Sequence, residues 1–77
     1  MIDRASILRE IGYNLEDRGT YWQTSAIFRD GDNKTALRIY KDSGVWSDFV
    51  EGNKPLPFEI LLKKTLNTND VSKYLSG

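Results

Sequence analysis

Basic and aromatic side chains gather in the middle of the sequence, and together they suit one kind of chemistry. Arg38 and Tyr40 are separated by a single residue, and Lys41 follows directly. Lys34 and Trp46 lie nearby on either side. Aromatic rings stack on the bases of single-stranded nucleic acid, and Arg and Lys side chains contact its phosphates. We therefore predict that these residues form a nucleic-acid-binding surface, with core packing as the alternative role of each ring.

The residue types used most often in catalysis are missing. The chain of 77 residues contains no His and no Cys, which removes the usual general bases and thiol nucleophiles. The serines at positions 25, 43 and 47 have no evident activating neighbour in the sequence. Asp30 begins a turn similar to a calcium loop, but Lys41 stands where that loop needs a glutamate. The sequence predicts a protein that is not an enzyme and holds no cofactor.

The charge distribution points to the same middle segment. The chain has 11 basic and 11 acidic residues, so its net charge is zero. This balance counts against a dedicated nucleic-acid binder, which usually shows a basic excess. Residues 18–41, however, contain five basic and two acidic side chains. If the protein has an anionic partner, we expect it to bind there.

Length and composition predict one small domain over residues 1–77, which is either a whole protein or the N-terminal part of a longer one. No apolar stretch approaches the roughly 20 residues that a membrane helix needs. The N-terminus carries charges where a signal peptide has an apolar core. These features, together with the absence of cysteine, favour a cytoplasmic protein without a membrane partner.

The elements that must position the candidate residues are three predicted strands. Aromatic and β-branched residues favour strands over 20–28, 35–40 and 45–50, and the turns 29–34 and 41–44 separate them. Such short connections predict a three-stranded antiparallel meander. Because side chains alternate between the two faces of a strand, Leu37 and Ile39 are expected in the core. Arg38 and Tyr40 are then expected to point outward.

Helices are predicted at both ends of the chain. Apolar residues recur at helical spacing from Ile2 to Gly12, with Asp3 or Ser6 as the N-cap. Pro57 suits the first turn of a second helix that runs to Leu66. A short final helix is predicted over 69–75. The expected fold is therefore α+β, with a sheet, an N-terminal helix and a C-terminal helix pair.

This order of elements resembles the N-terminal zinc-binding domain of bacterial and phage DNA primases. Residues 34–37 (KTAL) stand where that family has a Lys-Thr-Pro-Ser-like turn, and residues 48–51 (DFVE) stand where it has Cys-Phe-x-Cys. Gly52 and Phe58 match its following loop and helix. The segment 46–49 (WSDF) is similar to a variant found in phage and plasmid primase-like proteins. The resemblance implies a zinc-ribbon-like fold without metal, in which Asp48 and Glu51 occupy the degenerate former metal site.

The resemblance also implies a function. A primase-type module would bind single-stranded DNA in DNA replication, with a primase catalytic domain or a replicative helicase as further partners, in a bacterial or phage-infected cell. Asp48 and Glu51 are expected to pair with Arg29 or Arg38. Two carboxylates also suit a hard cation such as magnesium, although we expect no metal. The alternative is a phage protein-interaction adaptor that keeps the fold without binding DNA.

Overall fold

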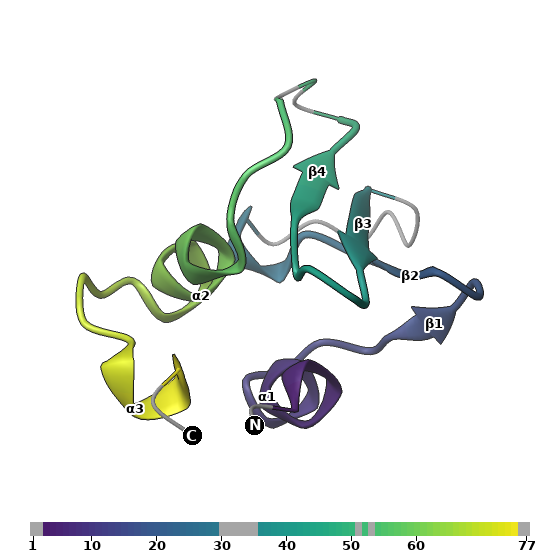
Figure 1. Ribbon diagram of the computed structural model, residues 1–77. Coiled ribbons are helices and arrows are strands. Elements are labelled where there is room, and N and C mark those ends of the chain that lie inside the picture. The colour runs from purple at the N-terminus through teal and green to yellow at the C-terminus, as the bar shows by residue number, and fades with distance from the viewer. Residues whose placement is uncertain (1–2, 30–35, 51, 53, 76–77) are drawn as a thin grey trace.

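The computed structural model describes residues 3–29, 36–50, 52 and 54–75, and it has the expected α+β architecture (Figure 1). In chain order, the elements are α1 (Arg4–Glu10), β1 (Glu16–Asp17), β2 (Tyr21–Thr24), the 3-10 helix η1 (Ile27–Arg29), β3 (Leu37–Tyr40), β4 (Trp46–Asp48), α2 (Phe58–Leu66) and α3 (Ser72–Leu75). The helices α2 and α3 lie to one side of the sheet, and α1 lies below it in the same view. In the part of the chain described, no helix is long and apolar enough to cross a membrane.

The sheet is an antiparallel meander with four strands in the order β1-β2-β3-β4, where three had been predicted. The additional strand, β1, consists of two exposed acidic residues, so the alternation of apolar and polar residues that reveals a half-buried strand is missing. The second strand is also shorter than predicted. After Thr24 the chain leaves the sheet, and the first two residues of η1, Ile27 and Phe28, are ones that had been assigned to the strand.

Strand pairing divides the sheet into two faces. The cross-strand partners Trp22, Ile39 and Trp46 share one face, and so do Thr24, Leu37 and Asp48. This core face is buried. The outer face carries the half-buried residues Tyr21, Gln23, Arg38, Tyr40 and Ser47. The predicted orientation of β3 is thus confirmed, with Leu37 and Ile39 inward and Arg38 and Tyr40 outward.

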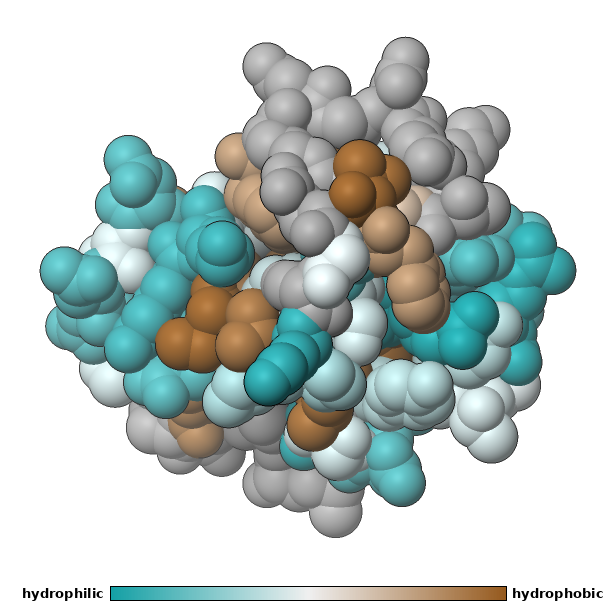
Figure 2. Space-filling view, turned by 90° about the horizontal axis from the view of Figure 1, so that it is seen from above, coloured by the Kyte–Doolittle hydropathy of each residue, from teal (hydrophilic) through white to brown (hydrophobic). Residues whose placement is uncertain are grey.

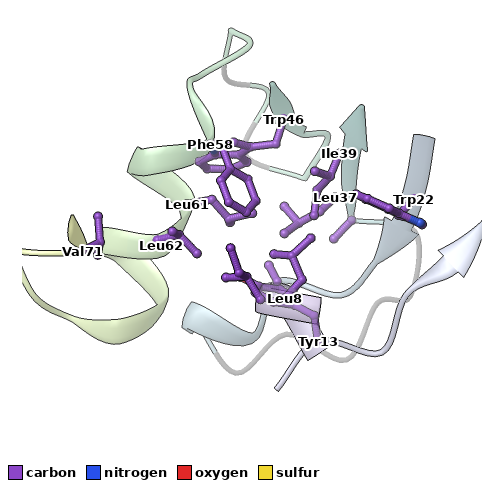
Figure 3. Close-up of a cluster of buried hydrophobic side chains, with 13 residues drawn as sticks. Leu8, Tyr13, Trp22, Leu37, Ile39, Trp46, Phe58, Leu61, Leu62 and Val71 are labelled. Atoms are coloured by element: carbon purple, nitrogen blue, oxygen red, sulfur yellow. The ribbon is translucent and has the colours of Figure 1, made fainter. Parts of the chain in front are cut away.

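The hydrophobic core lies between the core face and the helices α1 and α2 (Figure 3). Leu8 of α1 and Leu61 of α2 are completely buried, and both point toward β3. Trp46 is the largest side chain that is fully buried. Its indole nitrogen donates a hydrogen bond of 2.9 Å to the carbonyl oxygen of Pro57, so β4 is fastened to the start of α2.

Local signals explain where the helices begin and end. Asp3 is the N-cap of α1, because its carboxylate accepts a hydrogen bond from the backbone N–H of Ser6 at 3.2 Å. The helix α2 begins directly after Pro57 and ends at Leu66, as predicted. Asn67 then adopts the left-handed conformation, with φ of 53°, which commonly terminates helices. Before α2, Leu56 exchanges two backbone hydrogen bonds with Trp46, at 3.0 and 2.9 Å.

Candidate nucleic-acid interface

A continuous row of aromatic and basic side chains crosses the outer face of the sheet. We call it the outer row, and in spatial order it consists of Tyr40, Tyr21, Arg38 and Phe49. The ring centroids of Tyr40 and Tyr21 are 5.9 Å apart. The guanidinium carbon of Arg38 lies 4.4 Å from the Tyr21 ring centroid and 4.8 Å from that of Phe49. The guanidinium of Arg38 is therefore held between two aromatic rings.

Strand register brings this row together from three segments of the chain. Tyr21 on β2 is the cross-strand partner of Tyr40 on β3. Arg38 lies two residues before Tyr40, so it is a diagonal neighbour of Tyr21 on the same face. Phe49 follows β4, and its backbone N–H donates to the carbonyl oxygen of Ala36 at 2.8 Å. The row is thus built on paired backbone rather than on unsupported loops.

Among the described residues, Arg38 is surrounded by aromatic rings and not by carboxylates. Its Nε atom is buried and has no hydrogen-bond acceptor. Within the described residues, no carboxylate forms an ion pair with it. The neighbouring rings stabilise the cation through their negative faces, an effect of about 0.5–2 kcal/mol. A positive charge is therefore held on the outer face of the sheet, between two rings and without a carboxylate partner among the described residues, which suits an anionic ligand.

Arg18 lies beside the outer row but is already engaged. Its Nε donates to the side-chain oxygen of Gln23 at 3.2 Å. One of its terminal nitrogens also forms an ion pair of 3.0 Å with Glu16. Since both side chains of this pair are largely exposed, the pair is weak and screened by salt. Arg18 supplies a second cation that is partly neutralised.

Phe49 is the most exposed member of the row, with 53% of its surface accessible, and its neighbour Val50 is 58% exposed. Figure 2 shows that hydrophobic side chains reach the surface in separate groups among hydrophilic ones, outside the parts drawn in grey.

Tyr21 and Phe49 were missing from the predicted contact set. The register of the strands identifies them, and the sequence does not give this register directly.

Two of the predicted contact residues do not join the outer row. Trp46 is 0% exposed and packs in the core, so its proposed role in base stacking is wrong. The ammonium nitrogen of Lys41 lies 2.7 Å from a carboxylate oxygen of Asp17 and 5.8 Å from the Trp22 ring centroid. Lys41 follows Tyr40 directly, so it turns toward the opposite side of the sheet. This contact with Lys41 is the largest cause of a lowered pKa at Asp17.

Of the predicted residues, Lys34 and Glu51 lie outside the described part of the chain. Asp48 of the predicted former metal site is 1% exposed and sits on the core face. Its carboxylate accepts a hydrogen bond of 3.0 Å from the backbone N–H of Val50. Because Arg38 lies on the outer face, the expected pair between Asp48 and Arg38 is not formed. No group of three or more metal-ligating side chains occurs among the residues that the structure describes.

The two lysines of α2 contact other side chains of the protein, away from the outer row. Lys63 forms an ion pair of 3.3 Å with Glu59, one turn earlier. The ammonium of Lys64 lies 5.5 Å from the Phe28 ring centroid. These side chains line a hollow of about 300 Å³ at the C-terminal end of α2. Helix carbonyl groups make that end negative, so the hollow is a poorer anion site than the outer row.

Comparisons of this chain with protein-family models, with curated proteins and with solved structures find no match.

Proposed function

We propose that this protein is a non-catalytic module that binds single-stranded DNA through its outer row. The observation that carries the proposal is the guanidinium of Arg38, which lies between Tyr21 and Phe49 without a carboxylate partner among the described residues. The aromatic rings of the outer row can stack on the flat faces of bases. The Arg38 guanidinium can donate hydrogen bonds to a phosphate that lies between two such bases. This combination is typical of surfaces that bind single strands without regard to sequence.

The geometry favours a single strand over a duplex. In a duplex the base faces are stacked on one another and are unavailable to Tyr40 or Phe49. A single strand exposes them, and each base stacked on an aromatic side chain contributes about 1–3 kcal/mol to binding. The binding of a duplex depends mainly on contacts between basic side chains and phosphates. Because the outer row has few cations, it should bind a duplex with low affinity.

The biological context follows from the resemblance to primase N-terminal domains. On that basis, the module contributes to template recognition during DNA replication or primer synthesis. A primase catalytic domain or a replicative helicase would supply the chemistry, because this chain lacks the His and Cys residues on which most catalytic bases and nucleophiles depend. Asp48 and Glu51 are, in this proposal, remnants of a metal site and not ligands.

The test is fluorescence anisotropy of a labelled single-stranded DNA oligonucleotide titrated with the protein. We expect Arg38→Ala and Tyr40→Ala each to weaken binding by about 5-fold or more, because each removes one contact of the row. Tyr40→Phe keeps the ring and is expected to retain most of the affinity. Lys73→Ala is the charge-matched control, since Lys73 lies on α3 and its ammonium is over the Tyr74 ring.

A duplex of the same sequence completes the experiment and is expected to bind more weakly. The proposal is wrong if no single strand binds at about 100 μM protein, where non-specific affinity for DNA is normally detectable. It is equally wrong if Lys73→Ala weakens binding as much as Arg38→Ala does. Thermal unfolding of each variant checks that the fold is intact.

The exposed pair Phe49 and Val50 supports a second candidate, the protein-interaction adaptor. Adjacent apolar side chains at the surface are typical of protein contacts, and aromatic residues often dominate the energy of such contacts. DNA binding by the unchanged protein separates the two proposals, because an adaptor would bind no DNA at all. If DNA binds through the outer row only, Val50→Ser should leave the affinity unchanged.

A further inference from the structure

We infer that the outer row holds a segment of only two to three nucleotides, with one base stacked on Tyr40, one base stacked on Phe49 and a phosphate between them that contacts Arg38. This inference rests on the proposed function and adds the size of the ligand, its direction along the sheet and its weak dependence on salt.

The number of stacking positions follows from which ring faces are available. Arg38 covers one face of Tyr21 and one face of Phe49, since its guanidinium carbon lies 4.4 and 4.8 Å from their centroids. Tyr40 lies against Tyr21 at an angle of 58°, so a base cannot enter between these rings in parallel. The accessible positions are Phe49 at one end of the row and Tyr40 at the other. Each can hold one base.

The length of the row limits the segment in the same way. The three centre-to-centre distances of 5.9, 4.4 and 4.8 Å restrict the row to about 15 Å. A strand stacked as in a duplex advances about 3.4 Å per nucleotide, and roughly twice that distance when its bases are spread apart. Bases on Tyr40 and Phe49 with Arg38 between them require the spread form. The row therefore accommodates two to three nucleotides, which run mainly along β3, because Tyr40 pairs with Val45 at one end of that strand and Phe49 pairs with Ala36 at the other.

The charges predict a shallow dependence on salt. On the outer face, as far as the structure describes it, Arg38 is the cation without a carboxylate partner. Arg18 is paired with Glu16, and Lys41 is paired with Asp17 on the other side. Each phosphate contact to a single strand contributes about −0.7 to the slope of log affinity against log salt. We expect a slope between about −0.7 and −1.4, where the steeper value includes a contact from Arg18.

The test uses nuclear magnetic resonance titrations of the isotope-labelled protein with oligothymidylates of one to eight nucleotides, at low and moderate salt. We expect affinity to rise with length up to three nucleotides, and by about 5-fold or more when the strand becomes long enough for a base to occupy the second stacking position. For oligonucleotides longer than three nucleotides, affinity should rise only slightly, because a longer strand offers more equivalent positions at which the protein can bind. The backbone signals of Tyr21, Arg38, Tyr40 and Phe49 should shift, while those of α3 stay unchanged.

The variant Phe49→Leu removes the ring from an exposed position and should abolish the gain from the second to the third nucleotide. Two outcomes would overturn the inference while leaving single-strand binding in place. One is affinity that climbs steeply through eight nucleotides, and the other is a slope steeper than about −3, which means several phosphate contacts. Failure of every oligonucleotide to bind would instead reject the proposed function itself.

Discussion

At the scale of single residues, burial sets the chemistry of Tyr13. Its side chain is 3% exposed, and its hydroxyl lies 2.6 Å from that of Thr65. The Thr65 hydroxyl donates to the carbonyl oxygen of Leu61 at 2.8 Å, so it accepts the hydrogen bond that the Tyr13 hydroxyl donates. Burial raises the pKa of Tyr13 to about 12.

This shift predicts a loss of stability at high pH. The folded chain holds the Tyr13 proton more tightly than the unfolded chain, whose tyrosines have a pKa near 10. The contribution of the Tyr13 pKa shift to the free energy of unfolding is therefore fully present below about pH 10. It is lost as the pH rises from about 10 to 12. A shift of two pKa units corresponds to about 2–3 kcal/mol. Urea unfolding at several pH values measures this loss.

The matched variant is Tyr13→Phe, which keeps the ring and removes the titrating group. Its free energy of unfolding should decline less between pH 10 and 12 than that of the unchanged protein. The other tyrosines and the lysines contribute to both curves alike. Parallel curves for the two proteins would show that Tyr13 does not titrate as described.

Residue-scale reasoning also explains which candidate contacts could be predicted from the sequence. Alternation along β3 correctly assigned Leu37 and Ile39 to the core and Arg38 to the outside. Along β4, Trp46 and Asp48 must share one face, so either a large ring is exposed or a carboxylate is buried. The structure buries both, and the Val50 backbone N–H provides Asp48 with a hydrogen bond. Neither propensity nor charge pattern reveals that outcome.

At the scale of elements, the side chain of Arg4 joins α1 to the turn between β3 and β4. A terminal nitrogen of Arg4 donates to the carbonyl oxygens of Lys41 at 3.2 Å and Asp42 at 3.4 Å. The guanidinium carbon of Arg4 also lies 5.9 Å from the Phe58 ring centroid. The close approach of Arg4 and Phe58 to this turn is possible because residue 44 is a glycine.

We predict that Gly44→Ala destabilises the protein by about 2–4 kcal/mol, from left-handed backbone strain and from crowding. Gly44 has a φ of +76°, and an added Cβ would lie 2.5 Å from Nε of Arg4 and 2.9 Å from Cβ of Phe58. Gly19→Ala is the control, because Gly19 has a φ of +94° with nothing within 4 Å of an added Cβ. Chemical unfolding of both variants measures the difference.

Only backbone strain should affect Gly19→Ala, at a cost of about 1–2 kcal/mol. Equal losses for the two variants would mean that the turn yields easily and that Arg4 does not hold it against α1.

The elements themselves were predictable to different degrees for physical reasons. The helix α2 has a proline before it, an apolar stripe and a helix-ending Asn67, and all of these signals are local. The strand β1 has no local signal, because two acidic residues join the sheet only through pairing with β2. The outer row depends on register across three segments, so it could not be assembled from the sequence alone.

At the scale of the whole molecule, the core provides the stability that a metal site provides in many domains of this size. Small domains bury only about 60% of their unfolded surface, and metal often compensates for that deficit. Here the core face, α1 and α2 enclose Trp46 and a set of buried leucines.

We therefore predict that EDTA does not change the melting temperature, and that added zinc does not raise it. Differential scanning calorimetry measures both. Where a structural zinc ion folds a domain, chelation unfolds it, because the binding energy is also folding energy. A fall in melting temperature with EDTA that zinc reverses would contradict a metal-free fold.

The backbone pairing of Leu56 with Trp46 has a consequence for how copies of the molecule behave together. Unpaired edge strands invite neighbouring chains to add to a sheet, which leads to aggregation. On one side, Leu56 occupies the hydrogen-bonding positions of Trp46 at the free edge of β4. On the other side, the edge strand β1 is two residues long, and both residues are acidic. Because one edge is short and charged and the other is covered, neither edge readily pairs with the strand of another molecule. The sheet can therefore expose an aromatic row on its outer face without aggregating through its edges.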